Sequence, residues 1–204
     1  MGIKAAAFDY GKVISFPPDH GVMDELAAIG GVKREDLESL VWKFRGEYDR
    51  GLLNGQEYYR KILERLDVNP PDETLKKMAE IDMYSWKRVN PGTVKLMEEL
   101  KKAGLLLGIL SNMPHDFLAW ARKTIPVFSL PHVGIFSCEA LSIKPEEAIY
   151  RKLLSALGCR GEEVVFFDDV LENVNKAREL KINAFLWKDP ENARQELAGL
   201  GVQF

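Results

Sequence analysis

Four separated groups of polar residues in this chain are of the types that catalysis uses, and each follows a short apolar run. They are Asp9, Ser111 with Asn112, Lys144 with Pro145, and Asp168 with Asp169 and Asn173. Short buried runs that end in charge are typical of parallel strands, whose carboxyl ends share one edge of a sheet. Three carboxylates, one lysine and one serine meeting at such an edge indicate a divalent metal ion beside a phosphate-like anion.

The segments between these groups predict the elements that position them. We expect buried strands at residues 3–9, 105–110, 133–136, 164–167 and 183–187. Helices are expected between the later strands, because apolar residues recur there at helical spacing. Strands that alternate with helices imply right-handed crossovers and a parallel sheet. The predicted fold class is therefore α/β, with a Rossmann-like parallel sheet.

One stretch after the first strand has a different character. Residues 17–88 are charged, rich in long side chains and helical in pattern, with no convincing strand. Within them, Asn54 and Glu57 stand three residues apart, as in a capping box at the beginning of a helix. We therefore predict an α/β core made of residues 1–16 and 89–204, interrupted by an inserted α-helical cap.

Composition narrows the class of protein. The 204 residues are 46% hydrophobic, which suits one domain with a smaller insertion. A net charge of −3, from 28 basic and 31 acidic residues, favours neither nucleic acid nor an anionic membrane as partner. The cysteines Cys138 and Cys159 are isolated, and the first apolar run is too short for a signal peptide. We expect a cytoplasmic protein, and the sequence leaves its oligomeric state open.

The order of the four groups and the place of the insertion resemble the haloacid dehalogenase superfamily, in members with a helical cap between the first and second motifs. Any one motif is weak, but four in order on the expected elements are strong evidence. The resemblance implies a Mg²⁺-dependent phosphohydrolase in which Asp9 is the nucleophile and forms an aspartyl-phosphate. It also implies that Asp9, the carbonyl of Gly11 and Asp169 hold Mg²⁺. Asp168 would bind the ion directly or through water, and Asn173 would orient the cluster from behind.

The second and third motifs would hold the phosphoryl group. Ser111 and the backbone of Asn112 can donate to phosphate oxygens, and the ammonium of Lys144 would neutralise charge during transfer. Pro145 is expected in the first turn of the following helix. Each motif also has an ordinary structural interpretation. Ser-Asn turns are common, most lysines are solvated, and paired aspartates often cap helices.

Gly11 departs from the family pattern, which has a second aspartate at this position. Glycine keeps the carbonyl but lacks the acid that protonates the leaving group, and a positioned acid contributes on the order of 10²–10⁴ in rate. The substrate then has a good leaving group, such as an anomeric sugar phosphate, or the cap supplies a donor, with His20, Glu47 and Tyr48 as candidates. A third outcome is a nearly silent protein that binds phosphorylated ligands. Sugar-1-phosphate phosphatase-like members carry the same glycine, which favours the first outcome.

Two further alternatives concern the chemistry and the cap. A metal-independent 2-haloacid dehalogenase would use the same nucleophile, but serines usually replace Asp168 and Asp169 in that branch. The cap cations Lys43, Arg45 and Arg50 could meet a substrate phosphate, although a solvated helix face is the preferred interpretation. The remaining expectations are that Lys12 points into solvent and that Asp116 caps a helix. A small phosphorylated molecule is the expected partner.

Overall fold

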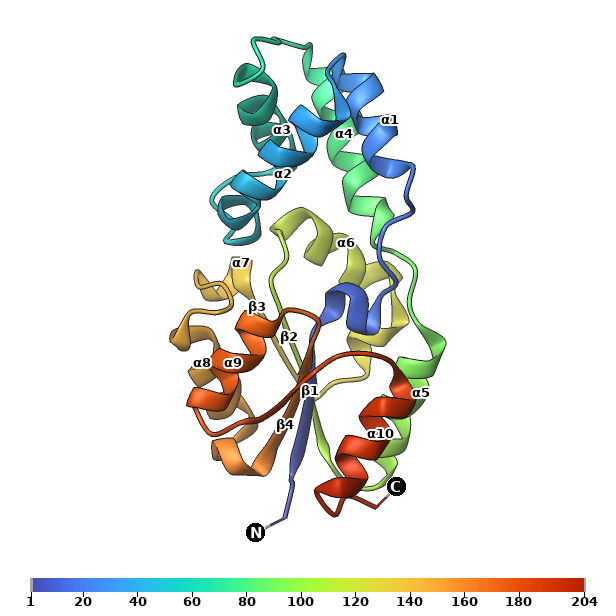
Figure 1. The fold of residues 1–204 in the computed structure, drawn as a ribbon, viewed down its shortest axis with the longest axis vertical. Helices are drawn as coiled ribbons and strands as arrows, with labels where there is room; N and C mark the ends of the chain where they lie inside the picture. The colour runs from blue at the N-terminus through green and yellow to red at the C-terminus, as the bar shows by residue number, and fades with distance from the viewer. Residues whose placement is uncertain (1, 204) are drawn as a thin grey trace.

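The computed structural model describes residues 2–203, and a five-stranded sheet lies at its centre (Figure 1). The strands are β1 (Ala5–Phe8), β2 (Leu106–Ser111), β3 (Val133–Phe136), β4 (Val164–Asp168) and β5 (Asn183–Leu186). Their order across the sheet is β3-β2-β1-β4-β5, and every neighbouring pair is parallel. The α/β class and the Rossmann-like parallel sheet predicted from the sequence are therefore confirmed.

The register of the sheet places polar groups at the same edge. Phe8, the last residue of β1, lies opposite Ile109 in β2 and Phe167 in β4. The backbone N–H of Asp9 continues this pairing and donates to the carbonyl of Phe167 at 2.9 Å. Asp9 therefore follows β1 at the level where β4 ends in Asp168.

Helices cover both faces of the sheet, and the alternation of side chains along the strands explains why. One face carries α5 (Pro91–Lys102), α6 (His115–Thr124) and α10 (Pro190–Gly199), and the other carries α8 (Glu147–Leu157) and α9 (Leu171–Glu179) (Figure 1). In β1 the side chains of Ala6 and Phe8 join the first apolar cluster, whereas Ala5 and Ala7 join the second. This is the two-residue period of a strand that is buried on both faces.

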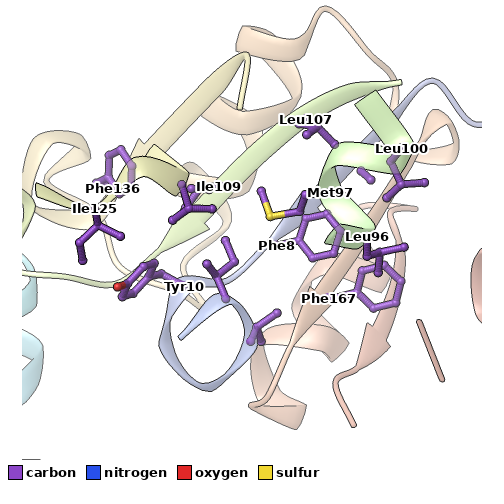
Figure 2. Close-up of a cluster of buried hydrophobic side chains, with 14 of the residues drawn as sticks. Phe8, Tyr10, Leu96, Met97, Leu100, Leu107, Ile109, Ile125, Phe136 and Phe167 are labelled. Carbon is purple, nitrogen blue, oxygen red and sulfur yellow. The ribbon is translucent and has the colours of Figure 1, made fainter. Parts of the chain in front are cut away.

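The cluster on the α5 side is drawn in Figure 2. The rings of Phe8 from β1 and Phe167 from β4 stack with centroids 5.4 Å apart, beside Leu96 and Met97 of α5 (Figure 2). Full burial of one such side chain stabilises a fold by about 1.5–3 kcal/mol. The residue before Asp9 and the residue before Asp168 are thus anchored in the core, which fixes the polar ends of their strands.

Four helices lie beyond the carboxyl edge of the sheet (Figure 1). They are α1 (Val22–Gly30), α2 (Arg34–Asp49), α3 (Gly55–Glu64) and α4 (Asp72–Ser85). They pack on an apolar cluster of their own, which includes Leu37, Tyr58 and Met78. The predicted capping box begins α3, because the Asn54 side chain accepts from the Glu57 N–H at 3.0 Å and the Glu57 side chain accepts from the Asn54 N–H at 2.8 Å.

The two connections between these helices and the sheet run side by side. Ser15 and Val89 form an antiparallel bridge. The N–H of Phe16 donates to the carbonyl of Arg88 at 2.8 Å, and the N–H of Asn90 donates to the carbonyl of Ile14 at 2.8 Å. From the separate apolar cluster and this paired neck we propose the predicted division, with residues 17–88 as a cap inserted into a core of residues 1–16 and 89–204.

The remaining short elements are η1 (Tyr10–Ile14), η2 (Pro126–Ser129), α7 (Ser137–Ala140) and η3 (Gly161–Glu163).

One boundary near the ends of the strands differs from the predicted one. The prediction that Pro145 lies in the first turn of a helix is wrong, because α8 begins at Glu147 with Glu146 at its N-cap. In the part of the chain that the structure describes, no helix has both the length and the apolar character to cross a bilayer.

Candidate active site

The carboxyl edge of the sheet gathers the acids that the sequence singled out. One carboxylate oxygen from each of Asp9, Asp168 and Asp169 lies within 4.8 Å of the other two. Asp9 follows β1, Asp168 ends β4, and Asp169 begins the loop to α9. Parallel strands end at one edge of a sheet, so residues about 160 positions apart in the sequence meet here.

Lys144 is buried between two of these acids and is not solvated. Its side-chain nitrogen lies 2.9 Å from Oδ1 of Asp9 and 2.6 Å from Oδ2 of Asp168, and the residue is 4% exposed. Burial alone would lower the pKa of Lys144, but the charges and hydrogen bonds of Asp168 and Asp9 outweigh it and raise that pKa above its ordinary value. The side chain is therefore a fixed ammonium.

The side chain of Asn112 fixes the backbone that carries this lysine. Its Nδ2 donates to the carbonyl of Lys144 at 3.1 Å, and its Oδ1 accepts from the N–H of Lys144 at 2.8 Å. The sequence had suggested only a backbone role for Asn112 at the phosphate. Two hydrogen bonds to the backbone N–H and carbonyl of this one residue instead tie the loop before α8 to the end of β2.

Asp168 is fully buried, and the protein itself occupies its oxygens. Oδ1 accepts from the N–H of Val170 at 2.8 Å and from Nδ2 of Asn173 at 3.0 Å, and Oδ2 accepts from Lys144. Asp169 is freer, since its side chain is 20% exposed and its recorded ion pair is with Lys12 at 3.3 Å. Of the two adjacent acids, Asp169 is therefore the one with oxygen atoms open to a ligand.

Asp9 is held in a setting that has an excess of negative charge. Oδ1 accepts from the N–H of Tyr10 at 2.7 Å. Burial raises the pKa of Asp9 to about 7; Lys144 and a hydrogen bond with Ser111 oppose this rise, and the charge of Asp168 reinforces it. Three carboxylates beside the ammonium groups of Lys144 and the more exposed Lys12 leave one negative charge uncompensated, and a bound cation is the group that would restore balance.

A cavity of about 250 Å³ connects this edge to the cap helices. Its floor includes Asp9, Gly11, Ser111, Asn112, Lys144 and Asp169. The cap contributes Trp42, Arg45, Tyr48, Asp49, Asp82 and Met83, from α2 and α4. Trp86, in the connection after α4, closes one side. The cavity therefore offers a charged floor and a partly aromatic roof to a small molecule.

Arg45 belongs to this roof, so the expectation of a solvated helix face is wrong for it. Its Nε donates to Oδ1 of Asp49 at 2.9 Å, and its Nη1 donates to Oδ2 of Asp82 at 3.2 Å. The side chain is only 16% exposed, and although burial lowers its pKa, Asp49 and Asp82 together raise it well above the ordinary value. Sequence reasoning missed Asp49, although its spacing of four residues from Arg45 is the signal of a helical ion pair.

The three cap residues proposed as proton donors do not converge on Asp9. Glu47 pairs with Lys61 at 2.5 Å outside the cavity, and His20 is exposed and lines a neighbouring cavity. Tyr48 lines the cavity, but its hydroxyl lies 3.2 Å from the place that a Cβ on Gly55 would occupy, at the beginning of α3. Burial, reinforced by Asp82, raises the pKa of Tyr48 above its ordinary range.

Lys43 is exposed, as expected, but three other charged residues make contacts that the sequence did not predict. Lys12 does not simply point into solvent, because it reaches Asp169 from a turn in which its φ is +58°. Arg50 makes a two-hydrogen-bond ion pair with Glu146, from the cap to the core. Asp116 does not cap its own helix α6, but its Oδ2 accepts at 2.7 Å from the N–H of Gly55, the first residue of α3.

Comparison with known proteins was made with this geometry in hand. A family model described as haloacid dehalogenase-like hydrolase matches residues 3–179. Bifunctional epoxide hydrolase 2 of Sus scrofa is 27% identical over 222 residues, which cover 100% of this chain and 40% of that protein. This chain thus spans about 40% of the length of that relative. Phosphatase MT3486 of Mycobacterium tuberculosis is 23% identical over 194 residues, which cover 91% of this chain and 88% of that protein.

Solved structures match over most of the chain. One is a HAD family enzyme of Bacteroides thetaiotaomicron in complex with magnesium and inorganic phosphate, with a TM-score of 0.73 and 22% identity over 92% of this chain and 96% of that one. Another is an L-2-haloacid dehalogenase of Xanthobacter autotrophicus with chloropropionic acid covalently bound, with a TM-score of 0.68 and 20% identity over 99% and 85% of the two chains. At such identities the matches show the fold alone, and they do not decide between the two chemistries.

Proposed function

Because the chain belongs to the haloacid dehalogenase-like hydrolases, we propose that it is a Mg²⁺-dependent phosphohydrolase acting on a small phosphorylated metabolite. The observation that carries the proposal is the cluster of Asp9, Asp168 and Asp169, whose oxygens lie within 4.8 Å of one another beside Lys144. A sugar phosphate is the first substrate class to test, because Gly11 suits a leaving group that needs little protonation. We expect the enzyme to act in the cytoplasm, on neither nucleic acid nor membranes.

The donor set of this cluster fits Mg²⁺. The ion prefers oxygen ligands, takes one or two carboxylates and keeps several waters. Asp9, Asp169 and the carbonyl of Gly11 would hold it, and Asp168 would act through bound water, since its own oxygens already accept hydrogen bonds. When bound, the ion supplies positive charge that polarises the phosphoryl group.

The chain's own residues would carry the reaction in two steps. A carboxylate oxygen of Asp9 attacks phosphorus, the bond from phosphorus to the leaving oxygen breaks, and an aspartyl-phosphate forms. The hydroxyl of Ser111, the backbone of Asn112 and the ammonium of Lys144 hold the phosphoryl oxygens. Water then attacks phosphorus and releases phosphate from Asp9. Closure of the cap over the cavity would exclude bulk water during both steps.

Two other functions make different demands on the same site. A silent module that binds phosphorylated ligands is favoured by one observation, the absence of a carboxyl at Gly11. A metal-independent 2-haloacid dehalogenase shares the nucleophile but has no use for the paired acids Asp168 and Asp169. The phosphohydrolase accounts for both the nucleophile and these acids, and we therefore prefer it.

One panel of assays separates the three functions. Sugar phosphates, aryl phosphates and 2-haloacids are incubated with the wild type and with Asp9→Asn, with Mg²⁺ and with a chelator. We expect phosphate release that needs both Mg²⁺ and Asp9. Phosphate binding without turnover above Asp9→Asn would favour the silent module. Halide release that is unchanged by the chelator would favour the dehalogenase.

A further inference from the structure

The position where the family has its general acid faces an aromatic ring in this chain. A Cβ built on Gly11 would lie 3.5 Å from a ring carbon of Trp86, with no other atom of residues 2–203 within 4 Å apart from residues 10–12 themselves. An indole has no group that transfers protons to alkoxides near neutral pH, since its N–H is only a hydrogen-bond donor. A leaving group that needs a proton to depart must therefore receive it from another group than residue 11.

We propose that Asp49, the last residue of α2, is the catalytic general acid that takes over the role missing at Gly11. The inference rests on the phosphohydrolase function proposed above. Asp49 lines the same cavity as Asp9 and Lys144, and it is 8% exposed. It belongs to the cap, so it would approach the leaving group from the side opposite the nucleophile's strand.

A hydrogen-bond relay through Ser137 holds Asp49 against the core. The hydroxyl of Ser137 donates to the backbone carbonyl of Asp49 and accepts from the N–H of Met113 at 2.9 Å. Met113 follows two residues after Ser111, in the loop that would hold the phosphoryl group. The position of Asp49 is thus tied to the end of β2, and does not depend on the cap helices alone.

The carboxyl group of Asp49 has one oxygen available. Oδ1 accepts from Nε of Arg45 at 2.9 Å, whereas no donor to Oδ2 is found among residues 2–203. Asp82, the other acid on Arg45, accepts from Nη1 with both oxygens, at 3.2 and 3.5 Å. Asp49 therefore shares the single guanidinium of Arg45 with a second buried acid.

The electrostatic surroundings raise the pKa of Asp49 above that of an ordinary aspartate. Burial raises its pKa, Arg45 opposes the rise, Asp82 adds to it, and the more distant charge of Lys144 opposes it. A carboxyl whose pKa is raised keeps its proton to higher pH than an ordinary aspartate does, which is the direction that a general acid requires.

The two proton transfers balance over one turnover. As Asp9 attacks phosphorus, the P–O bond to the leaving group breaks and its electron pair stays on the leaving oxygen. That oxygen takes the proton from Oδ2 of Asp49, which gives a neutral alcohol and a carboxylate. The carboxylate then takes a proton from the water that attacks the aspartyl-phosphate. The P–O bond to Asp9 breaks, its electron pair returns to Asp9, and Asp49 is protonated again.

The leaving-group dependence of turnover tests this role. The wild type, Asp49→Asn and Asp82→Asn are assayed with Mg²⁺ on phosphate monoesters whose leaving groups range from nitrophenols to simple alcohols. A general acid matters most for poor leaving groups, so we expect Asp49→Asn to lose on the order of 10²–10⁴ in kcat/KM on alkyl esters and only a few-fold on nitrophenyl esters. Asp82→Asn is the matched control, because it removes the other carboxylate on Arg45. We expect it to change alkyl and aryl esters by the same factor.

Two further measurements, on a second variant and on the wild type, keep the test decisive even if Asp49→Asn misfolds. Gly11→Asp combined with Asp49→Asn restores a carboxyl at the family position, and we expect it to recover alkyl-ester turnover. Equal losses of Asp49→Asn on alkyl and aryl esters would overturn the inference, as would a wild type whose rates fall steeply with leaving-group pKa. In both cases the phosphohydrolase function would stand. A wild type without turnover above Asp9→Asn would overturn the function and the inference together.

Discussion

The ammonium of Lys144 lies 2.9 Å from Oδ1 of Asp9, and both residues are more than nine-tenths buried. The same nitrogen reaches Asp168 at 2.6 Å. One cation therefore compensates two acids that end separate strands. Breaking a buried ion pair from one side leaves the other charge without compensation, which typically costs about 3–5 kcal/mol.

Lys144→Met tests this arrangement, because methionine keeps much of the side-chain volume and removes the charge. In the absence of Mg²⁺ we expect the free energy of unfolding at neutral pH to fall by about 3–5 kcal/mol. Turnover should fall by at least about 10²-fold, since a charged donor to the phosphoryl group is lost. Urea denaturation and phosphate release measure the two effects. Lys123→Met, at an exposed site on α6, is the control, and a stability loss equal to that of the control would contradict the prediction.

Magnesium should stabilise the folded protein through the acid cluster. A ligand that binds only the folded state adds about 2.7 kcal/mol at a concentration 100 times its Kd. We expect Mg²⁺ to raise the melting temperature of the wild type, and a chelator to reverse this. Asp169→Asn should greatly reduce the shift, because Asp169 is the acid with open oxygens, whereas Glu98→Gln, at an exposed site on α5, should preserve it. An equal shift in wild type and Asp169→Asn would refute the assignment of Asp169 to the metal.

The ion pair between Arg50 and Glu146 predicts a pH dependence of stability. Hydrogen bonds from Arg50, and to a smaller extent from Ser142 and the N–H of Ile143, lower the pKa of Glu146 from 4.5 to about 2 in the folded protein, against an opposing effect of burial. The folded-state pKa lies below the unfolded one, so the stabilisation is complete above about pH 4.5 and is lost as the pH falls toward 2. Because both side chains are partly exposed, solvent screening limits the contribution to about 0.5–1 kcal/mol.

Arg50→Met measures this contribution. We expect the difference in unfolding free energy between wild type and variant to be about 0.5–1 kcal/mol at pH 6 and to shrink toward zero near pH 2.5. Arg65→Met is the control, because Arg65 is exposed at the end of α3 and makes no ion pair recorded within residues 2–203. A difference that stays constant over this pH range would mean that Arg50 stabilises the cap–core contact by packing alone.

The sheet and the meeting of its polar ends could be predicted because both follow from local sequence. Apolar runs such as Ala5 to Phe8 predict buried strands, and parallel strands place their last residues at one edge whatever the distance between them in the chain. Boundaries were less accurate. β1 is shorter than residues 3–9, and α8 begins after Pro145 because the ends of elements depend on capping and on neighbouring segments.

The roof of the cavity could not be predicted, because it depends on how α2 and α4 face the sheet. Helical spacing shows that Arg45 and Asp49 share a face of α2, but not that this face is turned inward or that Asp82 of α4 completes it. Lys12 was misjudged for a related reason. Lys12 has a left-handed backbone conformation in η1 that directs its side chain toward Asp169, and no local sequence pattern predicts that turn.

Gly161 offers a test of the packing that supports β4. A Cβ at this position would lie 2.3 Å from the carbonyl oxygen of Leu180 and 2.9 Å from the carbonyl carbon of Lys181, both of them backbone atoms that cannot move independently. We expect Gly161→Ala to lower the free energy of unfolding by about 1–3 kcal/mol, as overpacking does. Gly199→Ala is the matched control, because a Cβ there meets nothing within 4 Å and the site is the last residue of α10.

The two substitutions should change stability in opposite directions. Alanine is favoured over glycine in helices, so Gly199→Ala should raise the free energy of unfolding by up to about 0.5 kcal/mol. Urea denaturation of both variants measures the contrast between a close backbone approach and an open helical site. If Gly161→Ala proved as stable as the wild type, the loop from Leu180 to Ile182 would have to lie farther from η3 than the structure shows.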